Sequence, residues 1–421
     1  MHLSGDKLIP CFLNGGSNML KNMITRALLT ACAILACAAL PLAAQGVSRQ
    51  DYSGLDKYLE QGRMSNSTFV GVRAAEFLTI PVGARGIGMG NAYSAVVEDI
   101  TATWWNPAGL GFLNQNEVTL TVVDYTLDLT YSYGAAAFPL MDGNLVVGGF
   151  FGYLDIPEME ITTISQPEGT GDYFRAYDFQ MGGAFAYNFS DRFLAGLSLK
   201  YVHQDMWSNI GASAFAIDAG AIYHTDLLDR EIKFAFTIQN LGTNLTMRGP
   251  NLVEEVGAEN RGGSFPNDTE NYNLDPNALS RRSSRAMLIR THTYMLPTTV
   301  KISLGYNIYT GNKFNWLAAG EIARPSYIPI AYAAGTELTY NFNQAYSAAG
   351  RMGWMIQTDE FTDETDQFGY EYYGDDPLFR GISFGMGFQR NFGGKVLMFD
   401  YAYRNKGRLS ADNFFSVSLG F

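Results

Sequence analysis

Apolar residues alternate with small or polar residues along most of the chain after residue 116. The last residues show the pattern clearly: Phe415, Val417, Leu419 and Phe421 alternate with Ser416, Ser418 and Gly420. Successive side chains of a β-strand point to opposite faces, so each such run predicts a strand with one apolar row and one small or polar row.

Fourteen segments carry this alternation. They are 117–126, 128–139, 143–154, 174–188, 192–205, 213–226, 231–240, 298–309, 314–323, 330–340, 346–357, 379–391, 394–405 and 412–421. Most are longer than the five or six residues typical of soluble strands. They match the roughly 9 to 11 residues that a tilted strand needs to cross a membrane.

The connections between these segments alternate in length. Those after even-numbered segments are all short, such as 140–142 and 392–393, whereas the longest, 155–173, 206–212, 241–297 and 358–378, follow odd-numbered ones. Even-stranded outer-membrane barrels have short periplasmic turns and longer outer loops. Tyrosines near the ends of the apolar rows fit interfacial girdles: Tyr153, Tyr201, Tyr223, Tyr306 and Tyr332. We therefore predict an all-β fold, an outer-membrane antiparallel barrel of about 14 strands over residues 116–421, rather than a soluble sandwich.

The amino-acid composition argues against two other classes of protein, helical membrane proteins and nucleic-acid-binding proteins. The 421 residues include 45 glycines and 14% aromatic residues, but only 17% charged residues, and the net charge is −12. A bundle of membrane helices would need repeated runs of about 20 apolar residues, and one such run exists, near the N-terminus. An acidic chain opposes binding to nucleic acid.

That single apolar run predicts an export signal over residues 1–45. Lys21 and Arg26 precede the apolar stretch 27–44, which ends in small residues. Met19 or Met23 would be a natural start, and the alternatives are a retained anchor or a lipidated cysteine. The three cysteines all precede the expected cleavage site, so the mature chain would have neither a disulfide nor a cysteine-ligated metal: Cys11, Cys32 and Cys37.

Eight charged residues fall on the row that faces away from lipid, four of each sign. They are Lys200, Asp218, Lys233, Lys301, Glu321, Glu337, Arg351 and Asp400. Charges in a sandwich core would be costly unless neutralised. We predict that they line the barrel lumen, either as a solvated and balanced interior or as a selectivity lining.

Residues 46–115 lack long alternation. We expect a short helix near 52–64, then glycine-rich and looped chain. Gly86, Gly88 and Gly90 invite comparison with a phosphate-binding loop, but that motif needs a strand–loop–helix context. The alternative is that these glycines let the backbone pack closely at positions where side chains would not fit. We therefore predict that residues 46–115 form a plug, or hatch, inside the barrel.

The stretch 83–110 resembles the N-terminal signature of the PorV/PorQ outer-membrane proteins, distant relatives of the FadL fatty-acid transporters. The resemblance covers about 30 residues and implies a hatched 14-stranded barrel. It also implies a role in type IX protein secretion, through binding of exported cargo. The residues that carry it are Gly83, Arg85, Gly88, Met89, Gly90, Asn106, Pro107 and Ala108.

Other candidate sites are weak. His203, His224 and His292 have no metal-like spacing, and no nucleophile elbow occurs, so we expect no enzyme and no cofactor. The acidic loop 358–376 is an alternative calcium site. Arginines of the longest loop are expected to attract it: Arg281, Arg282, Arg285 and Arg290. Loop tyrosines could bind a protein partner: Tyr272, Tyr294, Tyr370, Tyr372 and Tyr373.

The sequence thus predicts a non-enzymatic barrel that contacts outer-membrane lipid. Its first predicted role is as an accessory to protein secretion, with exported cargo or secretion-machinery subunits as partners. The alternative is a FadL-like transporter for small hydrophobic compounds.

Overall fold

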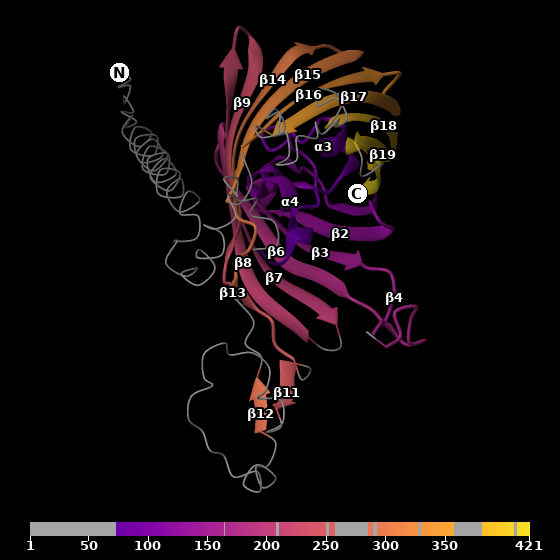
Figure 1. Ribbon diagram of the computed structural model, residues 1–421. Helices are drawn as coiled ribbons and strands as arrows, with labels where there is room; N and C mark the ends of the chain where they lie inside the picture. Colours follow the sequence, from indigo (N-terminus) through magenta and orange to yellow (C-terminus); the bar gives the residue numbers. More distant parts are fainter. Residues whose placement is uncertain are drawn as a thin grey trace, which may run out of the picture.

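The computed structural model describes residues 73–163, 165–207, 210–249, 252–256, 285–288, 293–326, 330–357, 381–407 and 411–421. Within them, fourteen antiparallel strands form a closed barrel (Figure 1). The barrel strands are β1 (Glu117–Tyr125), β2 (Leu129–Leu140), β3 (Leu145–Asp155), β6 (Tyr177–Ser190), β7 (Phe193–Trp207), β8 (Ile210–Leu227), β9 (Arg230–Gly242), β14 (Thr299–Thr310), β15 (Phe314–Pro325), β16 (Ala331–Asn341), β17 (Tyr346–Gln357), β18 (Ile382–Phe392), β19 (Lys395–Asn405) and β20 (Ala411–Gly420).

The ring closes where β1 pairs with β20, from Glu117 opposite Gly420 to Asp124 opposite Asn413. Three two-stranded ribbons lie outside the ring. They pair β4 (Met159–Glu160) with β5 (Tyr173–Phe174), β10 (Leu245–Thr246) with β13 (Thr293–Tyr294), and β11 (Val253–Val256) with β12 (Arg285–Leu288).

The two ends of the barrel differ. At one end, the turn end, the strands are joined by short connections only, including the 3-10 helix η5 (Met141–Gly143) and the turns at Leu228–Asp229 and Gly393–Gly394, all with left-handed residues. The other end, the loop end, carries the ribbons β4–β5 and β10–β13. The left-handed conformation lets a two-residue turn follow the right-handed twist of the flanking strands.

The outer face of the barrel is apolar. Phe215, Phe384 and Met386 are 56%, 49% and 63% exposed, and they alternate with buried or small residues that face inward. Only a closed ring satisfies every backbone hydrogen bond of a sheet in lipid. The chain is therefore a multi-pass outer-membrane β-barrel, as the strand pattern predicts.

Residues 73–116, here called the inner segment, lie inside the ring (Figure 1). They form η3 (Glu76–Thr79), α3 (Ala84–Gly88), α4 (Ala102–Trp105) and η4 (Pro107–Phe112). Helix α3 packs against β17 to β20, whereas η4 packs against β3 and β6 to β8 on the opposite wall. The inner segment therefore crosses the lumen.

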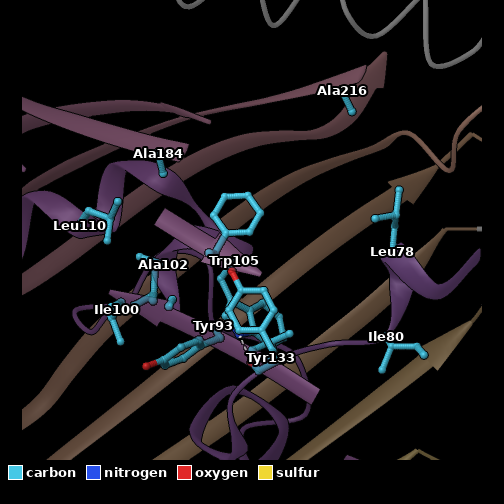
Figure 2. Packing of buried hydrophobic residues seen from close by; sticks show 14 of the residues in the cluster. Leu78, Ile80, Tyr93, Ile100, Ala102, Trp105, Leu110, Tyr133, Ala184 and Ala216 are labelled. Atoms are coloured by element: carbon cyan, nitrogen blue, oxygen red, sulfur yellow. Dashed lines mark hydrogen bonds between the residues drawn. The ribbon is translucent and has the colours of Figure 1, made fainter. Parts of the chain in front are cut away.

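The inner segment and the wall both contribute to the hydrophobic core. Tyr93, Ile100 and Trp105 are fully buried and pack toward Tyr133 of the wall (Figure 2). The same core contains small wall residues, including Ala184 and Ala216, both labelled in Figure 2, which leave room for the larger side chains of the inner segment.

Two expectations about local structure are wrong. Residues 206–212 are not a long loop, because β7 extends to Trp207 and β8 begins at Ile210. Register shifts between Asp205 and Trp207 let these strands continue past the expected ends. The glycine-rich stretch is also not looped throughout, as we expected, because the short helix α3 begins within it at Ala84. The expected helix near 52–64 and the export signal over 1–45 lie outside the described residues.

Candidate functional site

We call the eight residues that carry the resemblance of 83–110 the hatch motif. Its glycines lie where the inner segment meets the wall. Gly83 and Gly90 have φ values of 83° and 65°, which favour glycine. A Cβ on Gly88 would lie 2.9 Å from Cα of Gly385 in β18. The motif thus gives backbone-to-backbone contact, and no described feature of it resembles a phosphate-binding loop.

The wall supplies matching glycines. A Cβ on Gly353 would overlap the Gly90 backbone, and one on Gly335 would overlap Met89. On the opposite wall, side chains on Gly196 and Gly220 would overlap the Asn-Pro-Ala motif. These wall glycines are spread over β7, β8, β16 and β17, so the inner segment is seated on several strands at once.

Asn106 organises the second half of the inner segment. Its Nδ2 donates to the Ser94 carbonyl at 2.9 Å, and its Oδ1 accepts from the Ala108 amide at 3.1 Å. It is the N-cap of η4, and Pro107 occupies the first helical position, where no backbone N–H is needed. Nearby, Trp105 Nε1 donates to the Val82 carbonyl at 2.7 Å.

Replacing Asn106 by Ala should destabilise the protein. The change removes a buried cap and leaves the Ser94 carbonyl without this donor, which costs about 1–2 kcal/mol. Thermal unfolding in detergent should show a lower Tm than wild type. Asn144→Ala is the matched control, because Asn144 makes an exposed bond to Met141 in the turn η5. Equal Tm values for the two variants would contradict the role of Asn106.

A chain of ion pairs joins α3 to the wall. Arg85 makes two 2.8 Å bonds to Glu337 of β16. Arg351 of β17 bonds both Glu337 and Asp400 at 2.5 Å. Charge-assisted, bidentate pairs of this kind are the strongest hydrogen bonds available to side chains. We call Arg85, Glu337, Arg351 and Asp400 the latch.

Asp99 extends the latch within the inner segment. Its carboxylate lies 3.6 Å from the Arg85 guanidinium and accepts a 2.5 Å bond from Tyr93. Burial raises the pKa of Tyr93 well above its ordinary value, so the hydroxyl stays protonated and donates. The latch thus fixes both α3 and the chain before α4.

The remaining predicted lumen charges are also buried and paired. Lys200 bonds Asp218 at 2.8 Å and Asn240 at 2.5 Å. Lys233 pairs with Glu98 of the inner segment. Lys301 lies 3.5 Å from Glu321 and 4.8 Å from the centre of the Trp105 ring, a cation–π contact.

Two cavities flank the inner segment. The turn-side cavity has a volume of about 450 Å³ and is lined by polar groups that include Arg85, Asp99 and Glu337. The loop-side cavity has a volume of about 380 Å³ and is lined by Leu78, Trp104, Trp105, Tyr125 and Lys301, among others. The inner segment contributes to both linings, so it forms the partition between them.

Sequence reasoning missed the inner-segment partners of the wall charges. Glu98 and Asp99 lie in a segment without periodicity, so nothing in the pattern assigns them a facing direction. The wall glycines Gly335 and Gly353 were overlooked although they fall on the inward row beside Glu337 and Arg351. Glycine at inward positions of several strands is the signal that could have revealed the contact.

Several candidate sites lie outside the described residues. They are the acidic loop 358–376, His292, four loop tyrosines (Tyr272, Tyr370, Tyr372 and Tyr373) and three of the loop arginines (Arg281, Arg282 and Arg290). Among the described residues, no group of three His, Cys, Asp or Glu side chains could hold a metal ion. In the same part of the chain, no helix has the length and apolar character needed to cross a membrane.

Comparison with known proteins gives structural similarity alone. No family model and no curated protein matches the sequence. The fold is similar to a Pseudomonas aeruginosa FadL homologue (12% identity, 81% of this chain and 98% of that chain, TM-score 0.43). It is also similar to the toluene transporters TbuX of Ralstonia pickettii (11%, 80% and 97%, 0.46) and TodX of Pseudomonas putida (10%, 80% and 96%, 0.48). These values identify neither a family nor a substrate for this chain.

Proposed function

We propose that the protein is a gated outer-membrane channel for small hydrophobic compounds that carry an acidic group. The observation that carries the proposal is the loop-side cavity. Trp104, Trp105 and Tyr125 give it aromatic surface, and Leu78 and Pro325 add aliphatic surface. Its volume of about 380 Å³ lies in the range of ligand pockets, which are mostly apolar with a few placed polar groups.

The charges around this cavity favour an anion. Lys301, Arg404 and Lys406 line it, and none of the described residues of its lining is a carboxylate. Asp412, behind the lining, pairs with both Arg404 at 2.6 Å and Lys406 at 3.0 Å. One carboxylate therefore neutralises only one of these two cations. A ligand carboxylate would meet the remaining positive charge beside the aromatic surface.

Passage to the turn-side cavity requires the inner segment to move. It forms the partition between the two cavities, and the latch holds it closed. A bistable element held by a few contacts is the usual basis of gating. In this proposal, the latch residues set how often the channel opens, and the loop-side cavity selects what enters.

Lys406 provides the test of ligand class. We expect wild type to bind octanoate about tenfold more tightly than the neutral octanamide, because a charge-assisted hydrogen bond to a ligand contributes more than a neutral one. Lys406→Gln should remove this preference, and the Arg404–Asp412 pair stays intact. Isothermal titration in detergent measures both affinities. Lys313→Gln, in a turn at the turn end, should keep the preference. Equal affinity of wild type for both ligands would overturn the proposal.

A second candidate is the secretion accessory. The observation that favours it is the resemblance of 83–110 to the PorV/PorQ signature. The test is affinity purification of the full chain from solubilised outer membrane. Co-purification of exported proteins that share a C-terminal domain, with no octanoate binding, would favour the accessory over the channel.

A further inference from the structure

A polar hollow lies on the outer face of the barrel, away from the lumen. It has a volume of about 580 Å³ and is lined by His203, Asp205, Ser213, Thr246 and Arg248, together with neighbouring residues. His203 and Asp205 belong to the outward row of β7, and Ser213 to that of β8. The hollow is thus separate from both cavities described above.

The third side of the hollow comes from the chain around β10. Gly211 and Arg248 exchange two backbone hydrogen bonds of 2.9 and 3.0 Å, so this chain runs beside β8. Leu245 and Met247 are buried. Thr246 and Arg248 alternate with them and therefore point outward, as successive side chains of extended chain do.

Gly211 makes the depression. It lies on the outward row between β7 and the chain around β10. A Cβ there would come within 3.4 Å of the His203 ring and 3.6 Å of the Asp205 carboxylate. Any larger side chain would fill the space between these residues and Arg248. The hollow therefore exists because one outward position of β8 has no side chain.

Aromatic side chains lie directly on the membrane side of the hollow. The His203 ring is 5.2 Å from that of Phe179, and Tyr201 is 5.4 Å from Phe215. The Tyr201 hydroxyl donates to Ser213 at 2.7 Å, and His203 Nδ1 lies 2.9 Å from the same oxygen. Aromatic belts mark the level where acyl chains give way to headgroups. The hollow sits at the loop-end side of this belt, at headgroup height.

We propose that this hollow binds the headgroup of a membrane lipid that carries a phosphate and free hydroxyls. Arg248 supplies a fork of N–H donors that matches phosphate oxygens. Ser213 and Thr246 add hydroxyls, and the Asp205 carboxylate accepts hydrogen bonds from the hydroxyls of the headgroup. The aromatic surface below receives the acyl chains.

The test uses dioleoyl phosphatidylglycerol, whose head has both a phosphate and hydroxyls. Native mass spectrometry of the full chain in detergent counts bound lipid over a titration. Arg248→Ala and Gly211→Leu should each weaken binding about tenfold, through loss of a charge-assisted contact and through filling of the hollow. Arg324→Ala is the matched control, since Arg324 is an exposed arginine at the loop end of β15, three strands away from β8 in the ring, and should leave binding unchanged.

Two further ligands test separately whether the phosphate group and the acyl chains of the lipid contribute to binding. Dioleoylglycerol, which lacks the phosphate, should bind wild type no better than it binds Arg248→Ala. Inorganic phosphate should not displace the phospholipid, because it cannot use the aromatic surface. If Arg248→Ala and Arg324→Ala lost phospholipid binding equally, the lipid would be attracted by surface charge in general, and the proposed site would be wrong. Displacement by phosphate alone would overturn the assignment to a lipid. Heat-modified migration in gels confirms that each variant forms a barrel.

Discussion

Replacing Arg85 by Gln should open the barrel. The change leaves Glu337 with Arg351 alone and removes the only member of the latch that belongs to the inner segment. Breaking a buried ion pair from one side costs roughly 3–5 kcal/mol, and the Arg85 side chain is 23% exposed. We therefore expect the closed position to lose about 2 kcal/mol, which raises the open fraction about 30-fold.

Conductance in planar lipid bilayers measures this effect. Arg85→Gln should show frequent openings compared with wild type, and Arg85→Lys should lie between them because a lysine lacks the planar fork that bonds both carboxylate oxygens. Arg175→Gln is the control, since the Arg175–Asp155 pair is exposed and joins the end of β3 to the chain between β5 and β6. Identical conductance of Arg85→Gln and Arg175→Gln would show that the latch does not hold the inner segment.

Replacing Gly353 by Val should displace the inner segment without removing any charge. The new side chain would overlap the backbone of Met89 and Gly90, and neither backbone can retreat while α3 stays seated. Overpacking of this kind costs about 1–3 kcal/mol or more when backbone must shift. We expect the inner segment to become sensitive to protease, with a conductance increase like that of Arg85→Gln.

The same strand offers a control for this variant. Gly350 lies three residues earlier on β17, and a Cβ there would meet nothing within 4 Å. Gly350→Val should therefore match wild type in protease digestion and in conductance. Limited proteolysis followed by mass spectrometry locates the cuts. Cuts confined to the outer loops in Gly353→Val would argue that the wall glycines have no role in seating the inner segment.

The barrel is predictable from sequence because its two faces obey one simple rule. Lipid outside requires apolar side chains at every second position, and the segments 346–357 and 314–323 agree with β17 and β15 to within two residues. The alternation also places Lys200, Asp218 and Glu337 on the inward row, where the structure has them buried. The alternation alone tells which side chains face inward, so their contact partners need not be known for this prediction.

The inner segment follows no such rule, so its contacts could not be derived. Glu98 is paired with Lys233 of the wall, 135 residues away, and Asp99 is paired with Arg85, which Glu337 of the wall holds in turn. The predicted charge balance of the lumen counted wall residues alone, so it did not include Glu98 and Asp99. The end of β7 at Trp207 was also missed, because a register shift breaks the period of two at Asp205.

The position of the inner segment has a consequence for biogenesis. Its chain joins β1 at Glu117, at the turn end, and reaches Arg73 beside Leu296 and Ser326 at the loop end. It therefore threads the full height of a ring whose seam joins the first and last strands. Inserting about 40 folded residues into a closed barrel would require its wall to open, so we expect the inner segment to be in place before β20 pairs with β1.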